Sequence, residues 1–108
     1  MRIISGKFKG RRIPSFGKID ARPTTDFAKE GLFNILNNRI DFEGLSVLDL
    51  FAGTGSISFE FISRGSTNVI AVELNDKHCS YIRKIARELS IDDLIVLRAD
   101  AFRYLSSC

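Results

Sequence analysis

Residues 47–56 read VLDLFAGTGS, and this stretch decides the fold. It begins with an apolar run over 47–51, continues into a turn over 52–55 that contains two glycines, and opens a helical pattern at Ser56. A short apolar run followed by a glycine turn and a helix is typical of a strand buried in a parallel sheet. The glycines let the backbone approach a ligand closely, and the free N–H groups at a helix start favour an anionic group.

The same pattern of strand, turn and helix repeats along the rest of the chain. Apolar runs over 68–72 and 94–97 predict two further strands, and helices are expected over 76–89 and 101–105. Apolar strands that alternate with helices indicate an α/β fold whose parallel sheet is covered on both faces. As in doubly wound sheets, we expect the strand order 3-2-1, which is part of a Rossmann-like sheet.

Two segments precede this pattern at the N-terminus. Extended runs over 1–5 and 11–14 flank two glycines, which predicts a β-hairpin. An irregular linker is expected over 15–23. We therefore divide the 108-residue chain into a basic hairpin with its linker, 1–23, and half of a Rossmann-like domain, 24–108.

A helix is expected between the linker and the first strand. Thr25 has the hydroxyl of a good N-cap, and Asn38 ends the helical pattern. Apolar residues recur between them at spacings of three and four, which indicates one buried helix face. The residues of this predicted face are Phe27, Gly31, Leu32, Ile35 and Leu36.

The first strand of the predicted sheet has an open edge. Three strands are fewer than the roughly five or six of an average sheet, and nothing in the chain covers the outer side of the first one. Proteins avoid an open apolar edge because it pairs with other chains. We therefore expect that the chain is a fragment of a larger domain, or that it self-associates through the first strand.

Three acidic side chains mark the ends of the three predicted strands. Asp49 lies at the end of the first strand, Glu73 ends the second, and Asp100 follows the third. The carboxyl ends of parallel strands meet at one edge of the sheet, where ligands bind in open α/β folds. We therefore expect these acids to form one site, in which Glu73 accepts the hydroxyls of a ribose.

The spacing within this site favours S-adenosylmethionine over a nicotinamide cofactor. Asp49 lies four residues before Gly53, where a carboxylate can reach a methionine ammonium group, and Ser58 replaces the third glycine of the dinucleotide fingerprint. In the arrangement known from S-adenosylmethionine binders, an acid at the position of Asp100 accepts from the adenine amine. The predicted cofactor-binding residues are Asp49, Phe51, Ala52, Gly53, Gly55, Glu73, Leu74, Asp100 and Ala101.

Each of these residues also has a purely structural explanation. A single Gly-x-Gly turn often only connects a strand to a helix, Glu73 can begin a helix, and Asp100 can cap one. Cofactor binding is favoured because the glycine turn and all three acids occur together.

Positive charge is concentrated at the N-terminus. Residues 1–25 hold seven basic side chains and one acidic one, whereas the remaining residues hold nine basic and twelve acidic ones. A basic segment attached to a mildly acidic body favours an anionic partner, although such a segment can also be only a solvated face.

The rest of the composition argues against several classes of protein. No apolar run approaches the roughly 20 residues that span a bilayer, and the basic N-terminus is not followed by the apolar stretch of a secretory signal. Cys79 and Cys108 have neither metal-ligand spacing nor the density of a disulfide framework, and His78 is the single histidine. We expect a cytoplasmic protein with free thiols and no metal site.

Several motifs together resemble one bacterial enzyme family. They are RIISG at 2–6, GRRI at 10–13, RPTTD at 22–26, LFNIL at 32–36 and DLFAGTG at 49–55. In this order they resemble the bacterial 16S ribosomal RNA guanine-N2 methyltransferases, and the match covers nearly the whole chain. The resemblance implies a Rossmann-like class I methyltransferase fold. It also implies methyl transfer from S-adenosylmethionine to the exocyclic amine of a guanine in small-subunit ribosomal RNA.

The resemblance also implies that the target-base site is absent from this chain. The family holds the guanine amine with an Asp-Pro-Pro-Tyr or Asn-Pro-Pro-Tyr motif after a fourth strand, whereas the prolines here are Pro14 and Pro23. We therefore predict no catalytic residue in this chain, and no methyl transfer from it alone. An RNA partner would be contacted at its phosphates, and the predicted RNA-binding residues are Arg2, Lys7, Lys9, Arg11, Arg12 and Arg22.

Other functions are compatible with parts of this pattern. A DNA adenine or small-molecule methyltransferase uses the same scaffold, although the N-terminal motifs argue against it. A nicotinamide-dependent dehydrogenase is disfavoured by Asp49 and Ser58. A non-catalytic RNA-binding module would bind RNA but no adenosine-containing ligand, and Phe8 could either stack on a base or pack beneath the hairpin.

Overall fold

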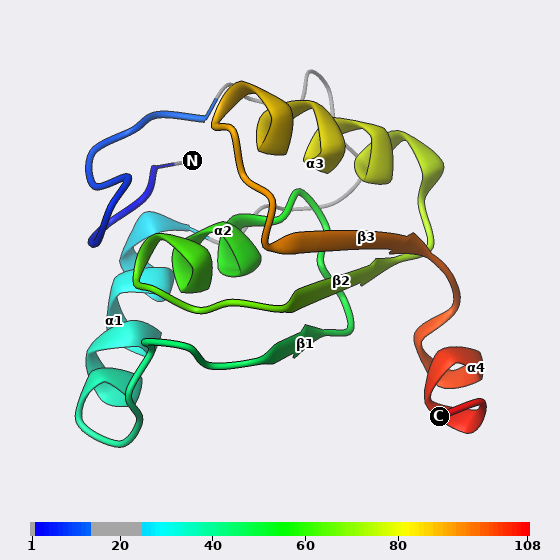
Figure 1. Ribbon diagram of the computed structural model, residues 1–108, viewed down its shortest axis with the longest axis horizontal. Helices are drawn as coiled ribbons and strands as arrows, with labels where there is room; N and C mark the ends of the chain where they lie inside the picture. Colours follow the sequence, from blue (N-terminus) through cyan, green and yellow to red (C-terminus); the bar gives the residue numbers. More distant parts are fainter. Residues whose placement is uncertain (1, 14–24) are drawn as a thin grey trace.

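The structure is a computed structural model that describes residues 2–13 and 25–108 (Figure 1). Helices and strands alternate along the second segment, as the sequence predicts. The elements described there are α1 (Asp26–Asn37), β1 (Val47–Asp49), α2 (Ser56–Ser63), β2 (Val69–Glu73), α3 (Asp76–Glu88), β3 (Leu94–Arg98) and α4 (Ala101–Ser106). None of these described helices combines the length and apolar character that a membrane span requires.

The strands that the structure describes form one parallel, three-stranded sheet. β2 lies in the middle, with β1 on one side and β3 on the other, which confirms the predicted order and the Rossmann-like α/β fold. β1 is shorter than predicted, because it ends at Asp49 and Leu50 and Phe51 already belong to the turn. The Gly55 N–H donates to the Ala52 carbonyl at 2.8 Å and closes this turn.

Helices α2 and α3 cover one face of the sheet. Figure 1 shows both helices on the same side of the strands, whereas α4 lies away from them, beyond the carboxyl end of β3. Ala71 of β2 is fully buried in a cluster with Phe59 of α2 and Ile82 of α3. Burial of a side chain such as Phe59 contributes about 1.5–3 kcal/mol relative to leaving it exposed. This apolar layer holds the two helices on the sheet.

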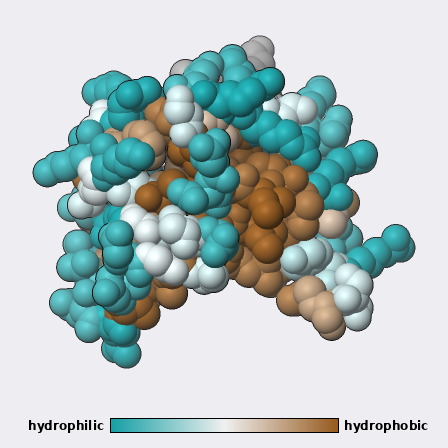
Figure 2. All heavy atoms as spheres, in the orientation of Figure 1, coloured by the Kyte–Doolittle hydropathy of each residue, from teal (hydrophilic) through white to brown (hydrophobic). Residues whose placement is uncertain are grey.

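The opposite face of the sheet carries apolar side chains that the described residues leave partly uncovered. By register, Leu48, Ile70 and Ile95 lie side by side across β1, β2 and β3. Leu48 is 42% exposed and Ile95 is 55% exposed. Figure 2 shows apolar surface over the middle of the strands. A contiguous apolar surface of this kind marks a contact surface.

The buried face of α1 differs from the prediction. The sequence predicts burial of Phe27, Leu32 and Ile35, but these side chains are 89%, 42% and 58% exposed. Lys29 and Phe33 are fully buried in their place. The prediction was wrong because it ranked residues by hydropathy alone, whereas the buried ammonium group of Lys29 has an acidic partner on α2.

Aromatic rings attach α1 to α2. Phe33 packs edge to face on Phe61, with ring centroids 4.9 Å apart, and lies 5.7 Å from Phe42. The guanidinium of Arg64 lies 4.6 Å from the centroid of the Phe33 ring, which is within the range of a cation–π contact. These contacts explain why Phe33, and not the more exposed apolar residues of α1, faces the core.

The predicted N-terminal hairpin is present only as a loop closed by a single antiparallel bridge. Arg2 and Arg12 form the bridge, and the Ile3 N–H donates to the Arg11 carbonyl at 3.1 Å. The Gly10 N–H also donates to the Ile3 carbonyl at 2.9 Å, but the Ser5 N–H, which longer pairing would use, donates to a side chain of α2 instead. The linker predicted over 15–23, with the domain boundary after it, lies outside the described residues.

The uncovered sheet face and the outer edge of β1 predict self-association. Within the described residues, β1 pairs only with β2. Leu48→Lys places a charge on this edge strand and is expected to increase the monomer fraction, because a charged side chain opposes edge-to-edge pairing. Size-exclusion chromatography with light scattering over a range of concentrations measures this fraction.

The control for this experiment is Ser80→Lys, which adds the same charge at an exposed position of α3. It should leave the distribution of monomers and oligomers unchanged. A wild-type chain that stays monomeric at every concentration would contradict the prediction.

Candidate cofactor site

The carboxyl ends of the described strands meet at one edge of the sheet. β1 ends at Asp49, β2 ends at Glu73, and Asp100 follows β3. The backbone links the last two strand ends, since the Ala99 N–H donates to the Glu73 carbonyl at 3.1 Å. The structure thus brings the three acids of the predicted site to the edge where ligands bind in open α/β folds.

The turn between β1 and α2 has a backbone conformation that favours glycine. The angle φ is +57° at Gly53 and +85° at Gly55, both in the left-handed region. A Cβ on Gly55 would lie 2.9 Å from the Phe59 ring and 3.1 Å from the side chain of Ile82. Gly53, by contrast, faces open space within the described structure, so a ligand can approach its side of the turn.

Glu73 holds this turn against the end of β2. Its Oε1 accepts from the Gly53 N–H at 2.8 Å, and its Oε2 accepts from the Asn75 N–H at 2.8 Å. Nδ1 of His78 lies 3.7 Å from the same Oε2. Backbone bonds to both oxygens fix the orientation of the carboxylate, while its other lone pairs can still accept from hydroxyl groups.

Asp49 is half-buried at the end of β1. Its Oδ2 accepts from the hydroxyl of Ser58 at 2.7 Å. Burial raises the pKa of Asp49, hydrogen bonds from Ser58 and from the Phe51 N–H partly oppose this, and the charge of Glu73 raises the pKa further. A cationic ligand group placed here would offset the cost of keeping this carboxylate ionised.

Asp100 caps the N-terminus of α4. Its Oδ1 accepts from the N–H groups of Phe102 at 3.0 Å and Arg103 at 3.1 Å. The alternative explanation given in the sequence analysis, that Asp100 caps a helix, is therefore correct for its Oδ1 atom. Both of these contacts use Oδ1, so a capping role is compatible with a ligand contact at Oδ2.

Exposed apolar side chains adjoin the three acids. Phe51, Leu74 and Phe102 follow β1, β2 and β3 and are 72%, 62% and 71% exposed. The rings of Phe51 and Phe102 meet edge to face, with centroids 6.2 Å apart. Ala52 and Ala101, which were also predicted to bind the cofactor, are buried. Apolar and aromatic side chains beside a few fixed polar groups are the usual composition of a small-molecule site.

Sequence reasoning missed two serines of α2. Ser58 is fully buried and donates to Asp49, whereas the sequence marked it only as a departure from glycine. Ser56 is buried in the first turn of α2, and its Oγ has no hydrogen-bond partner among the described residues. A hydroxyl directly after Gly-x-Gly is the signal that could have indicated Ser56, because a buried polar atom requires a partner.

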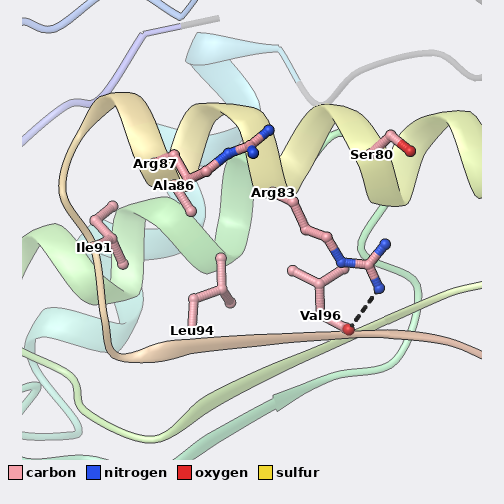
Figure 3. Close-up of a pocket in the computed structure, with 7 residues that line it drawn as sticks. All are labelled: Ser80, Arg83, Ala86, Arg87, Ile91, Leu94 and Val96. Atoms are coloured by element: carbon pink, nitrogen blue, oxygen red, sulfur yellow. Dashed lines mark hydrogen bonds between the residues drawn. The ribbon is translucent and has the colours of Figure 1, made fainter.

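A separate groove of about 460 Å³ lies between α3 and β3 (Figure 3). None of the predicted cofactor residues lines it. Arg83 reaches from α3 to β3, where its Nη2 donates to the carbonyl of Val96 at 3.0 Å. A charged side chain that lies over β3, at the edge of the described sheet, opposes pairing of that strand with another chain. The groove is therefore part of the sheet margin and is distinct from the strand-end site.

Five of the six basic side chains predicted to bind RNA lie on the N-terminal loop, residues 2–13, called the basic loop below. Phe8 is half-buried against the hydrophobic core, and the Lys7 ammonium lies 5.3 Å from the centroid of its ring. Packing beneath the loop is therefore the observed position of Phe8. Arg22 lies outside the described residues. The other predicted RNA-binding side chains are all exposed: Arg2, Lys7, Lys9, Arg11 and Arg12.

The part of the chain that the structure describes contains no grouping of three or more His, Cys, Asp or Glu side chains suited to a metal ion. Cys79 and Cys108 are free thiols. Burial raises the pKa of the Cys79 thiol, and its Sγ lies 3.3 Å from the Glu73 carbonyl oxygen. This cysteine therefore belongs to the packing around the end of β2.

Comparison with known proteins identifies methyltransferases that resemble this chain in fold and in sequence. The solved structure "Putative methyltransferase yhhF from Escherichia coli" matches with a TM-score of 0.85 at 28% identity, over 98% of this chain and 56% of that chain. Ribosomal RNA small subunit methyltransferase D of Buchnera aphidicola subsp. Baizongia pistaciae is 35% identical over 97% of this chain and 53% of its own length. The Escherichia coli (strain K12) protein of the same name is 34% identical over 99% of this chain and 49% of its own length.

The fold is that of the Rossmann-like class I methyltransferases, with a partial parallel sheet. The chain spans about half the length of the curated relatives that it matches. It belongs to the family described as conserved hypothetical protein 95, which matches residues 1–108. The resemblance found in the N-terminal motifs and the glycine turn is thereby confirmed.

The half-buried carboxylate of Asp49 is expected to lower the stability of the fold when it is ionised. Because the folded-state pKa of Asp49 lies above its ordinary value of 3.8, ionisation of this group lowers the free energy of unfolding as the pH rises. Asp49→Asn is therefore expected to raise the melting temperature at pH 7. The Ser58 hydroxyl can rotate to accept from the new amide.

The increase should shrink as the pH falls toward the ordinary pKa, below which Asp49 of the wild type is protonated in both the folded and the unfolded state. Thermal unfolding at pH 7 and near pH 4 measures the two differences. Asp92→Asn removes a charge at an exposed position and serves as the control. A melting temperature that falls equally at both pH values would contradict this account of Asp49.

Proposed function

We propose that the chain is the S-adenosylmethionine-binding half of a ribosomal RNA methyltransferase. The observation that carries the proposal is the bond between the Glu73 carboxylate and the Gly53 N–H, which joins the end of β2 to the glycine turn beside the half-buried Asp49. A dinucleotide fingerprint would instead place a third glycine at Ser58. The names of the relatives support the same class of enzyme.

In this proposal each strand end supplies one recognition element. Asp49 binds the ammonium group of the methionine part, and this contact neutralises the buried carboxylate. Glu73 accepts from the ribose hydroxyls, and Asp100 accepts from the adenine amine. Leu74 and Phe102 provide apolar contact surface for the adenine ring.

The residues present fit this ligand. Gly53 faces open space, and the buried hydroxyl of Ser56 has no partner among the described residues, so a polar ligand group at the turn would satisfy it. The exposed side chains of Phe51 and Phe102 would be covered by the same ligand. When bound, S-adenosylmethionine supplies an electrophilic methyl group on a sulfonium sulfur. The residues of this chain bind and orient the molecule that carries it.

We further propose that the methyl acceptor is the exocyclic amine of a guanine in small-subunit ribosomal RNA. The names of the curated relatives support small-subunit ribosomal RNA as the substrate, and the resemblance of the N-terminal motifs supports the guanine amine. The exposed basic side chains of the basic loop suit contacts to phosphates, which position an RNA without reading its sequence. The chain has no Asp-Pro-Pro-Tyr or Asn-Pro-Pro-Tyr motif, so we propose that it binds cofactor and RNA without methyl transfer when it is alone.

Titration calorimetry of the chain with S-adenosylhomocysteine tests the cofactor. We expect the wild-type chain to bind it and not to bind NADH. Glu73→Ala removes the ribose acceptor and the support of the glycine turn, and is expected to weaken binding by about 10–100-fold, the range for hydrogen bonds to a charged group. Glu88→Ala removes the same charge from an exposed position at the end of α3 and serves as the control.

Circular dichroism of each variant establishes that it is folded. A folded wild-type chain that binds NADH in place of S-adenosylhomocysteine would overturn the cofactor proposal. Equal losses of affinity in Glu73→Ala and Glu88→Ala would show that the strand-end site is not the binding site.

The salt dependence of binding to a small-subunit ribosomal RNA fragment tests the RNA partner. One variant carries alanine at four exposed residues of the basic loop: Lys7, Lys9, Arg11 and Arg12. The control carries alanine at four exposed basic residues of α3 and α4: Lys77, Lys84, Arg87 and Arg103. Only the loop variant is expected to flatten the slope of log K against log salt, by about 0.7 for each lost phosphate contact. Equal slopes would show that the basic loop is only a solvated face.

A further inference from the structure

The last turn of α2 forms a cradle for the backbone of the basic loop. The Glu60 carboxylate accepts from the Ile4 N–H at 2.8 Å through Oε1 and from the Ser5 N–H at 3.1 Å through Oε2. The Ser63 hydroxyl accepts from the Phe8 N–H at 2.9 Å and donates to the Ser5 carbonyl at 2.6 Å. These partners are 55 to 58 residues apart in the sequence, so the position of the loop is set by tertiary structure.

Gly6 brings the loop into direct contact with the end of α2. Its φ is +87°, and a Cβ at this position would lie 1.9 Å from the carbonyl oxygen of Ser63. The Lys7 N–H donates to the same oxygen at 2.7 Å. A residue with a side chain at position 6 therefore requires the loop to move away from α2.

Glu60 is a buried anion held between two cations. Its side chain is fully buried, Lys29 Nζ lies 3.4 Å from Oε1, and Arg64 Nε lies 2.8 Å from Oε2. Lys29 also donates to the Arg2 carbonyl at 2.5 Å, so it contacts the loop directly. Buried ion pairs add little net stability compared with apolar residues, and their best-attested role is to specify one geometry. The geometry specified here is that of the basic loop on α1 and α2.

This docking leaves the basic side chains exposed. The bonds to Glu60 and Ser63 come from the loop backbone, whereas the side chains of Lys7, Lys9 and Arg11 remain at the surface. α2 begins directly after the glycine turn and ends at the cradle, and its eight residues span about 12 Å. The glycine turn over 52–55, called the cofactor turn below, and the basic loop are therefore held at the two ends of one short helix.

We propose that Glu60 and Ser63 are positioning residues that hold the basic loop as a preorganised RNA-binding platform at a fixed distance from the cofactor turn. The inference rests on the proposed function, because it concerns the RNA contact of that same enzyme. A platform that is ordered before binding avoids the cost of ordering it on the RNA. Its fixed distance from the turn sets where a bound RNA lies relative to the methyl donor.

Two glycines of the loop provide a matched pair of variants. Gly6 and Gly10 have φ values of +87° and +81°, so alanine has a similar backbone cost at both positions. Gly6→Ala collides with Ser63, whereas a Cβ at Gly10 meets no atom of the described residues within 4 Å. Neither variant changes a charge. The difference between them therefore separates loop docking from backbone strain.

The whole chain is assayed for binding of a roughly 20-nucleotide polyuridylate and of S-adenosylhomocysteine. Gly6→Ala is expected to bind the RNA about tenfold more weakly than Gly10→Ala, with a flatter salt dependence. Both variants are expected to bind S-adenosylhomocysteine as the wild type does. Amide exchange at Ile4 and Ser5 should be slow in the wild type and in Gly10→Ala but fast in Gly6→Ala, which reports release of the loop.

Ser63→Ala is a milder second variant, since it removes two loop bonds and leaves the buried charges in place. It is expected to weaken RNA binding less than Gly6→Ala, by about threefold. RNA binding as tight as that of the wild type in both variants, with fast exchange at Ile4 and Ser5, would overturn the inference. Loss of S-adenosylhomocysteine binding in step with RNA binding would also overturn it, because the effect would then be general unfolding.

A different result would identify a failure of the proposed function. If the wild-type chain binds S-adenosylhomocysteine but no RNA, the RNA contact itself is wrong, and the positioning role falls with it. If the wild-type chain binds RNA and the Gly6→Ala effect is absent, only the positioning role is wrong.

Discussion

The buried carboxylate of Glu60 is the constraint on which the N-terminal part of this structure depends. An unpaired buried anion costs several kcal/mol, so its neighbours must supply cations and hydrogen-bond donors. Lys29 and Arg64 supply the cations, and the backbone of the basic loop supplies two donors. This requirement decides which face α1 turns toward α2. It also limits the N-terminal hairpin to one bridge, because the Ser5 N–H, which longer pairing would use, donates to Glu60.

Helix α2 joins this cluster to the strand-end site. Its first turn follows the glycine turn and carries the buried hydroxyl of Ser56, while its last turn carries Glu60 and the loop cradle. Phe59 packs this helix against the sheet, and Phe61 packs it against α1. A short helix that is packed at several points is more rigid than a flexible segment. It therefore keeps the basic loop and the cofactor turn at a constant distance and orientation.

The candidate site contains features that are unfavourable without a ligand. Asp49 is ionisable and half-buried, the Ser56 hydroxyl has no partner among the described residues, and Phe51 and Phe102 expose aromatic rings. Each is a local departure from what stability alone favours, and such departures concentrate at functional sites. The exposed apolar face of the sheet is a departure of another kind, since an exposed apolar surface marks a contact surface.

The sequence by itself determined the order of elements, the parallel sheet with its strand order, the glycine turn and the three acids at the strand ends. It could do so because these features follow from local periodicity and from the rule that parallel strands end at one edge. Only the tertiary structure decided that Lys29 and Phe33 face inward, that Ser58 donates to Asp49, and that the loop docks on α2. The partners that stabilise a buried charge or hydroxyl come from distant parts of the chain, so no local pattern around Lys29 or Glu60 could reveal them.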